Sequence, residues 1–117
     1  MIVGIGVDLI ELERIAEVVK RQPRFIDRVF THYEKNMLTT YTGVRKMEFL
    51  AGRFAAKEAF VKAAGTGISK KYSWLDIEVR KEASGKPTLV VAGLQGTAHL
   101  SISHSENYAI AQVIIEN

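Results

Sequence analysis

The hydrophobic pattern of this chain changes its period at Gly65, and that change constrains the fold more than any other feature. Between a short apolar run at residues 2–7 and Gly65, apolar residues recur at helical spacing, and the longest such segment runs over residues 45–64. After Gly65 the period becomes two, which is typical of strands whose side chains alternate between two faces. Helices followed by a run of strands predict an α+β fold, with a largely antiparallel sheet and one long central helix.

The expected elements follow from these two periods. In the N-terminal half we predict a strand over residues 2–7 and helical segments over residues 11–20, 25–30, 33–41 and 45–64. In the C-terminal half we predict strands over residues 74–81, 88–91, 100–104 and 108–115, whereas the glycine-broken segment 94–99 is ambiguous. No repeat, low-complexity tract or linker divides the 117 residues, so we expect a single domain spanning residues 1–117.

Composition excludes several classes of protein. The content of 47% hydrophobic and 25% charged residues is ordinary for a globular domain, and a net charge of +3 is too small to indicate nucleic acid as a partner. The absence of cysteine excludes disulfides, thiolate zinc sites and a thiol nucleophile. The apolar start of the chain has no basic segment before it and is interrupted by glycines and Asp8. We therefore expect a cytoplasmic protein with neither a signal peptide nor a membrane span.

Two carboxylates occupy unfavourable positions. Glu58 falls within the apolar stripe of the predicted long helix, and Asp8 ends the apolar, glycine-punctuated run at the start of the chain. An unpaired ionised carboxylate in apolar surroundings is costly, so each should be paired or bound to a metal. Lys62, at i+4 from Glu58, is placed to pair with it without using all its oxygens. Hard oxygen ligands with a lysine nearby suit Mg²⁺ holding a phosphate.

Each carboxylate also has a purely structural interpretation. Asp8 and Glu11 have the spacing of a capping box at the start of the following helix. Glu58 and Lys62 have the spacing of an intrahelical ion pair at the rim of the core. Capping does not exclude metal binding, because a carboxylate has two oxygens. The residues by themselves leave these interpretations open.

The segment from residue 20 to residue 28 is rich in positive charge, with four basic residues and a single acidic one, Asp27. Arg21, Arg24 and Arg28 are spaced i, i+3 and i+7, so a single helix would place them along one side. Such a pattern indicates either a solvated helical face or a docking strip for an acidic partner. The charge pattern alone does not decide between them.

Several segments in this order resemble the phosphopantetheinyl transferases. They are Gly-Ile-Gly-Val-Asp at residues 4–8, Phe-Ala-Ala-Lys-Glu-Ala-Phe-Val-Lys at residues 54–62, and the segments 65–68, 84–87 and 99–105. With the short length of the chain, they are most similar to the holo-(acyl carrier protein) synthases of that family. The resemblance implies transfer of the 4′-phosphopantetheine group of coenzyme A to a serine of apo acyl carrier protein, with release of 3′,5′-ADP, in fatty acid biosynthesis.

The resemblance also implies roles for particular residues. Asp8 and Glu58 would bind Mg²⁺, or Mn²⁺, and Lys62 would join them in catalysis. The residues implied in binding coenzyme A are Arg45, Arg53, Lys62, Gly65, Thr66, Ser84, Gly85, Lys86, Pro87 and His104. Those implied in docking the carrier protein are Arg14, Arg21, Arg24 and Arg28. Members of this short type are trimers with active sites between subunits, so we expect a homotrimer. The base that accepts the serine proton is left open.

Two other functions compete with the transferase. A metal-dependent nuclease would use Asp76 and Glu78 on a strand, together with Arg80 or Lys81. Strand alternation, however, places Asp76, Glu78 and Arg80 on one polar face, which is ordinary for a solvated strand. A non-catalytic oligomeric module would bind an acidic protein through the basic residues between 20 and 28. That module would leave Glu58 unexplained, so we expect the transferase.

Overall fold

The computed structural model describes all residues from 1 to 117. Its N-terminal half contains β1 (Ile2–Glu11), α1 (Leu12–Arg21), α2 (Phe25–Val29), α3 (His32–Leu38) and the long helix α4 (Gly43–Ala64). Its C-terminal half contains a 3₁₀ turn, η1 (Trp74–Asp76), and the strands β2 (Ile77–Lys81), β3 (Pro87–Val91), β4 (Thr97–His104) and β5 (Tyr108–Glu116). The predicted α+β class with one long helix is confirmed. None of the helices combines the length and apolar composition that crossing a membrane requires.

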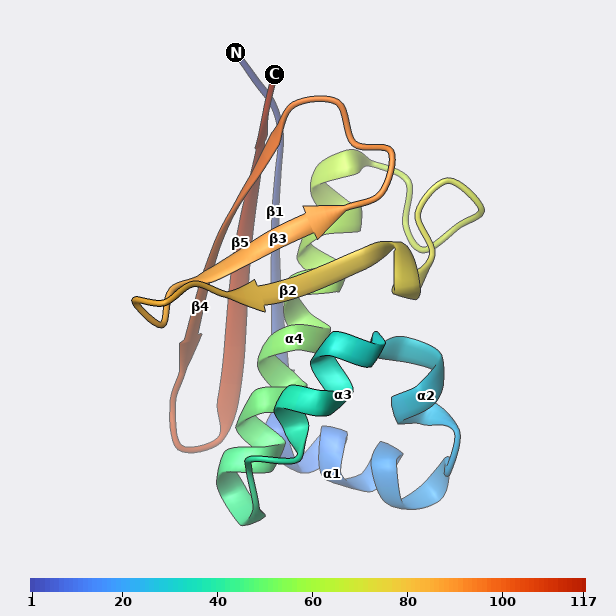
Figure 1. The fold of residues 1–117 in the computed structure, drawn as a ribbon, viewed down its shortest axis with the longest axis vertical. Coiled ribbons are helices and arrows are strands. Elements are labelled where there is room, and N and C mark those ends of the chain that lie inside the picture. Colours follow the sequence, from blue (N-terminus) through green and yellow to red (C-terminus); the bar gives the residue numbers. More distant parts are fainter.

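The strands form two antiparallel sheets on different sides of α4. One sheet has the order β1–β5–β4 and the other pairs β2 with β3. Figure 1 shows α4 passing along the first sheet, with α1, α2 and α3 gathered around its N-terminal half and β2–β3 in front of it. Alternate residues of β5 face α4 and are buried, namely Ala109, Ala111, Val113 and Ile115. The long helix therefore forms the centre of the molecule.

The close contact between β1 and α4 depends on glycine. A Cβ atom added at Gly4 would collide with the backbone oxygen of Ala63, and one added at Gly6 with that of Ala59. Glycine is needed because no side chain fits between two backbones in contact. This contact places the residues that follow Gly6 on β1 directly against the C-terminal half of α4.

The core consists of two hydrophobic clusters that share α4. The first lies between α4, β5 and β2 and includes the fully buried Phe60, Ile77 and Val113. The second lies between α1, α2, α3 and the N-terminal half of α4, and includes Ile15 and Leu50. Burial of one large apolar side chain contributes about 1.5–3 kcal/mol, so both clusters hold α4 firmly in place. Side chains on α4 are consequently presented in defined directions.

Most predicted boundaries lie within a few residues of the observed ones, but two predictions were wrong. The first strand continues four residues beyond Val7, because β5 pairs with it as far as Glu11. Residues 74–76 form a 3₁₀ turn instead of strand. The cause is local, since a carboxylate oxygen of Asp76 accepts hydrogen bonds from the backbone N–H and the hydroxyl of Ser73, each at 2.9 Å.

Candidate active site

Asp8 and Lys62 form an ion pair that joins β1 to α4. The Lys62 Nζ donates to Asp8 Oδ1 at 2.9 Å and to the backbone oxygen of Val7 at 3.2 Å. Lys62 does not pair with Glu58, the structural interpretation that its i+4 spacing left open, because β1 brings Asp8 within its reach. The capping box, the structural interpretation left open for Asp8, does not form either. Asp8 lies within β1, and the capping position of α1 is Glu11, whose side chain makes no capping hydrogen bond.

Glu58 is half-buried and makes no hydrogen bond or ion pair with the protein. Burial raises the pKa of Glu58, and the nearby charge of Asp8 raises it further, while Lys62 partly opposes the shift. A cation beside Glu58 would oppose this shift and favour the ionised carboxylate. The predicted unfavourable position of Glu58 is therefore confirmed, although its side chain remains accessible.

Asp8 and Glu58 line the same pocket, which has a volume of about 440 Å³. Both oxygens of Glu58 and Oδ2 of Asp8 are uncommitted, and no third histidine, cysteine or carboxylate joins them as a metal ligand. Magnesium is usually bound by one or two carboxylates together with waters and phosphate oxygens. These residues therefore fit a divalent cation that is held jointly with a phosphate group.

The same pocket continues as an apolar groove. Its walls include Ile15, Val18, Phe25 and Phe54, and Arg14 stands at its side. A neighbouring pocket, which shares Phe25, is lined by Arg21, Arg24 and Arg28. These three arginines do not share a single helix, because α1 ends at Arg21 and α2 begins after Arg24, in keeping with the two predicted helical segments. They nevertheless gather beside the groove that leads to Glu58.

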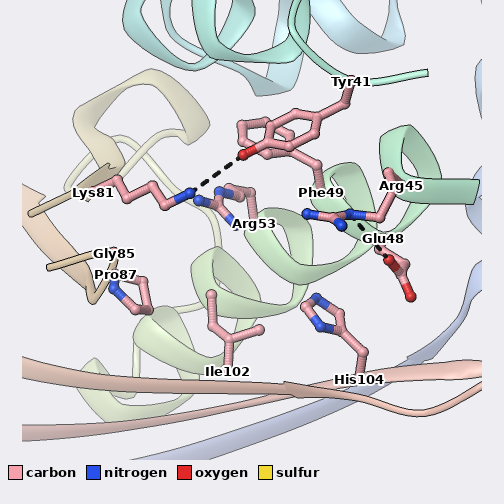
Figure 2. Close-up of a pocket in the computed structure, with 10 residues that line it drawn as sticks. All are labelled: Tyr41, Arg45, Glu48, Phe49, Arg53, Lys81, Gly85, Pro87, Ile102 and His104. Atoms are coloured by element: carbon pink, nitrogen blue, oxygen red, sulfur yellow. Dashed lines mark hydrogen bonds and ion pairs between the residues drawn. The ribbon is translucent and has the colours of Figure 1, made fainter. Parts of the chain in front are cut away.

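A second pocket, of about 260 Å³, contains much of the set predicted to bind coenzyme A. Arg45 and Arg53 extend into it from α4 and His104 from β4, while Gly85 lines it from the turn between β2 and β3 and Pro87 from the start of β3 (Figure 2). The remaining predicted residues lie outside this pocket: Lys62 pairs with Asp8, Gly65 and Thr66 follow the end of α4, and Ser84 and Lys86 belong to the turn without lining the pocket.

Aromatic rings hold the arginines of this pocket. The guanidinium of Arg53 lies 4.1 Å from the ring centroid of Phe49, and that of Arg45 lies 5.7 Å from the ring of Tyr41. Burial lowers the pKa of Arg53, while the nearby Tyr41 and Glu34 oppose that shift. Its Nε is buried without a hydrogen-bond partner. Since arginine stays charged in proteins, this pocket is suited to an anion.

The two pockets lie on different sides of α4. At about 100° per residue, Glu58 is turned about 140° around the helix axis from both Arg45 and Arg53. The carboxylates face β1 and the apolar groove, whereas the arginines face β4 and the β2–β3 turn. One chain therefore presents the two halves of the predicted site in different directions.

Sequence reasoning missed a fully buried ion pair beside the site. Lys57 and Glu34 are both completely inaccessible, and Lys57 Nζ lies 2.7 Å from Glu34 Oε1. Two signals were present: Lys57 lies seven residues after Leu50, on the buried face of the helix, and Thr31 and Glu34 have capping-box spacing. The capping box is confirmed. Nothing in the sequence pattern indicated that its glutamate would also meet a lysine of α4.

The carboxylates proposed for a nuclease do not converge on a common site. Asp76 is bonded to Ser73. Glu78 accepts a hydrogen bond from the hydroxyl of Thr31 at 2.6 Å and pairs with Arg80 Nε at 2.6 Å. Their oxygens are engaged by neighbouring protein groups, so this strand favours a structural role.

Comparison with known proteins shows the family of the chain. The family model of the 4′-phosphopantetheinyl transferase superfamily matches residues 4–113. The holo-[acyl-carrier-protein] synthase of Shouchella clausii is 59% identical over 116 residues, which cover 99% of each protein. That of Exiguobacterium sibiricum is 57% identical, and the match covers 99% of this chain and 90% of the relative.

Solved structures show the same relationship. The holo-(acyl-carrier-protein) synthase of Bacillus anthracis, in complex with CoA (3′,5′-ADP), gives a TM-score of 0.93 at 52% identity, covering 99% of this chain and 97% of that one. That of Helicobacter pylori, in complex with coenzyme A, gives 0.85 at 32% identity, covering 96% and 99%. Sequence and fold thus agree, and the chain belongs to the 4′-phosphopantetheinyl transferase superfamily, in the group of the holo-[acyl-carrier-protein] synthases.

Proposed function

We propose that this protein transfers the 4′-phosphopantetheine group of coenzyme A to a serine of apo acyl carrier protein and releases 3′,5′-ADP. The observation that carries the proposal is the facing pair Asp8 and Glu58, which has uncommitted oxygens at the end of an open groove. The names of the relatives and the CoA complex of the Bacillus anthracis protein support the same reaction.

Asp8 and Glu58 are the residues that would hold Mg²⁺, and Mn²⁺ is an alternative because it accepts the same ligands. When bound, the cation neutralises the pyrophosphate and stabilises the charge that develops on the leaving phosphate. Lys62 is positioned to help, because its ammonium group has three donors and only two are engaged, by Asp8 and Val7. The third is free for a phosphate oxygen.

The arginine-lined pocket would receive the nucleotide end of coenzyme A. Arg45 and Arg53 supply planar, charged donors suited to a phosphate, and His104 adds a ring that packs over Gly52. A Cβ atom at Gly52 would lie 3.3 Å from Nε2 of His104, so the glycine leaves room for this ring against α4. Gly85 of the β2–β3 turn and Pro87 at the start of β3 line another side of the pocket.

We propose that the complete active site forms between neighbouring subunits of a homotrimer. The outer face of β1 exposes Val3, Ile5, Val7 and Leu9, each by 51–60%, and Ile110 of β5 continues this apolar face. Soluble monomers rarely expose a contiguous apolar surface of this kind. Because Glu58 and Arg53 face different directions in one chain, an adjacent subunit would bring a basic pocket to the carboxylates.

The acidic carrier protein would dock beside the apolar groove. Arg14, Arg21, Arg24 and Arg28 surround its entrance and would attract an acidic partner and orient it. An acceptor bound there would direct its serine toward Glu58. The product, holo carrier protein, serves fatty acid biosynthesis, and the cytoplasm is the proposed compartment. Neither nucleic acid nor a membrane is proposed as a partner.

Mass spectrometry of an apo acyl carrier protein, after incubation with this protein, coenzyme A and Mg²⁺, tests the proposal. We expect the mass of one phosphopantetheine on the acceptor serine, with no gain after chelation of the metal. Glu58→Gln should abolish the gain, and Glu17→Gln, on the exposed side of α1, should not. Arg24→Glu should weaken binding of the carrier. If several carrier proteins gain nothing while coenzyme A still binds, the protein is a binding module instead.

A second measurement tests the assembly. Sedimentation equilibrium of the whole protein should give a trimer, and Ile5→Glu should give a monomer because it places charge at the centre of the apolar outer face of β1. A wild-type monomer that transfers phosphopantetheine at full rate would contradict the shared site.

A further inference from the structure

Lys57 is the one fully buried basic side chain of the molecule, and the proposed reaction gives it no role. Its Nζ donates to the backbone oxygen of Val29 at 2.6 Å, to Glu34 Oε1 at 2.7 Å and to the backbone oxygen of Trp74 at 3.1 Å. Val29 ends α2, Glu34 lies in α3, and Trp74 begins η1. A single ammonium group therefore joins three separate segments to α4.

The ion pair with Glu34 does not by itself explain why a lysine occupies this position. Removing two charges from water costs about as much as their attraction returns, and an apolar side chain of similar size is often equally stable. An apolar side chain, however, has no donor for the two carbonyl oxygens. What the lysine adds is direction, because hydrogen bonds of good geometry fix the orientation of the groups that they join.

The segments that Lys57 joins also support one wall of the groove that leads to Glu58. This aromatic wall consists of Phe25 and Phe54, whose ring centroids lie 5.7 Å apart. The ring of Trp74 stacks on that of Phe54 at a centroid distance of 5.2 Å and an interplanar angle of 25°. Trp74 does not line the groove itself, so it supports the aromatic wall and leaves the surface of the groove to Phe25 and Phe54.

Helix α2 depends on outside support because it is short. It has five residues and no side-chain cap at its N-terminus, and a helix of this length is not stable alone in water. Burial of Val29 attaches α2 to the core, and the hydrogen bond from Lys57 fixes how the helix is turned. Arg28 belongs to α2 and Arg24 immediately precedes it, and both line the basic pocket beside the groove. The position of these arginines is therefore set in part by a lysine in the core.

We infer that Lys57 is a positioning residue for the carrier protein. Through the carbonyl groups of Val29 and Trp74 it holds α2 and the aromatic wall in the arrangement that the acidic partner meets. It touches neither the partner nor coenzyme A, because its side chain is completely inaccessible. The role rests on the proposed transfer to carrier protein, and its effect should be confined to that substrate, since the arginine-lined pocket contains no residue of α2, α3 or η1.

The test removes both members of the buried pair, so that no unpaired charge is left in the core. In Lys57→Met/Glu34→Gln, the glutamine oxygen can still accept from the backbone N–H of Val79. We expect the KM for apo carrier protein to rise about tenfold, while the KM for coenzyme A and kcat change less than about twofold. Trp74 is the single tryptophan of the chain, so its fluorescence emission should move to longer wavelength as its stack on Phe54 loosens.

Trp74→Leu tests the same wall from a partly exposed position. It keeps the backbone oxygen that Lys57 holds and removes the ring that supports Phe54, so it should raise the KM for the carrier protein and not that for coenzyme A. Should the double variant fail to fold, the carrier KM of Trp74→Leu decides.

Val113→Ala is the matched control, because it creates a cavity in the other hydrophobic cluster, which contains no residue of α2 or η1. It should lower the melting temperature and change neither KM in assays below that temperature. An equal rise of the carrier KM in this control would overturn the role of Lys57, because the effect would then follow from lost stability alone.

An unchanged carrier KM in the double variant, equal increases in both KM values, or no effect of Trp74→Leu would also overturn the role of Lys57 and leave the transferase intact. Absence of transfer to any carrier protein by the wild type would overturn the proposed function and this role together.

Discussion

Two lysines on α4 are five residues apart, and each contacts a carboxylate from another part of the chain, yet their surroundings are opposite. Lys57 is fully buried and donates to Glu34 Oε1 at 2.7 Å, to the backbone oxygen of Val29 at 2.6 Å and to that of Trp74 at 3.1 Å. Lys62 is 54% exposed and has only two acceptors, Asp8 and Val7. All donors of the first ammonium are engaged, whereas the second retains one.

The carboxylates show the same contrast. Glu34 accepts from the backbone N–H of Thr31 at 2.8 Å and of Val79 at 2.7 Å, in addition to Lys57. Glu58 accepts from no protein group, and Asp8 has one free oxygen. The difference teaches that hydrogen-bond saturation, and not charge pairing itself, separates the structural pair from the pair proposed to act in catalysis. Lys57 and Glu34 join α3 and β2 to α4, and Lys62 and Asp8 remain available to a ligand.

The largest expected effect concerns the stability of the buried pair. Lys57→Met should lower the free energy of unfolding by about 3–5 kcal/mol, because it leaves Glu34 buried and unpaired. Lys62→Met, the matched control on the same helix, should change it by less than about 1 kcal/mol, since exposed pairs contribute little. Denaturant unfolding of both variants measures the difference. Equal losses in the two variants would contradict the distinction.

The next effect concerns catalysis. Glu58→Gln should lower the rate of phosphopantetheine transfer by about a hundredfold or more, because it removes one of two ligands for the cation. Its free energy of unfolding without metal should not fall, since the charged Glu58 side chain has no protein partner to lose. Added Mg²⁺ should raise the melting temperature of the wild type and not of the variant. A variant that is inactive only because it is unfolded would contradict this prediction.

A smaller effect is expected at Lys62. Lys62→Met should reduce kcat/KM for coenzyme A about tenfold, because one charge-assisted contact to phosphate is lost while the carboxylates remain. Lys70→Met, which removes an exposed lysine from the loop after α4, should leave kcat/KM unchanged. Steady-state kinetics at saturating carrier protein separates the two variants. A loss as large as that of Glu58→Gln would assign Lys62 a more central role than its free donor indicates.

The smallest effect is a pH dependence of stability in metal-free protein. The pKa of Glu58 is raised above its unfolded value, so the folded state holds this proton more tightly than the unfolded chain does. Stability from this group is therefore present below the unfolded pKa and decreases as the pH rises through the folded pKa. The free energy of unfolding of wild type and Glu58→Gln is measured in a chelating buffer from about pH 4 to 7. As the pH rises, the wild type should lose stability relative to the variant. Parallel curves would contradict the shift.

Much of the fold was predictable from the chain because its signals are local. The change of period at Gly65 predicted both the long helix and the strands that follow, and Gly65 does adopt the left-handed conformation with φ 76° at the helix end. The expectation for the site came from the family resemblance, which implied roles for Asp8, Glu58, Arg45 and Arg53, and it stays a prediction. The sequence pattern did not predict which group each charged side chain would contact.

The amino-acid sequence by itself determined the class of fold, the position of α4 and the residue types of the site, because helix periodicity and turn chemistry act over a few residues. Only the tertiary structure decided that Lys62 meets Asp8 instead of Glu58, since that contact spans 54 positions along the chain. It also decided that Lys57 forms a buried ion pair with Glu34 and that the two pockets lie on different sides of α4. Such contacts depend on which strands and helices pack together, and no local pattern encodes that choice.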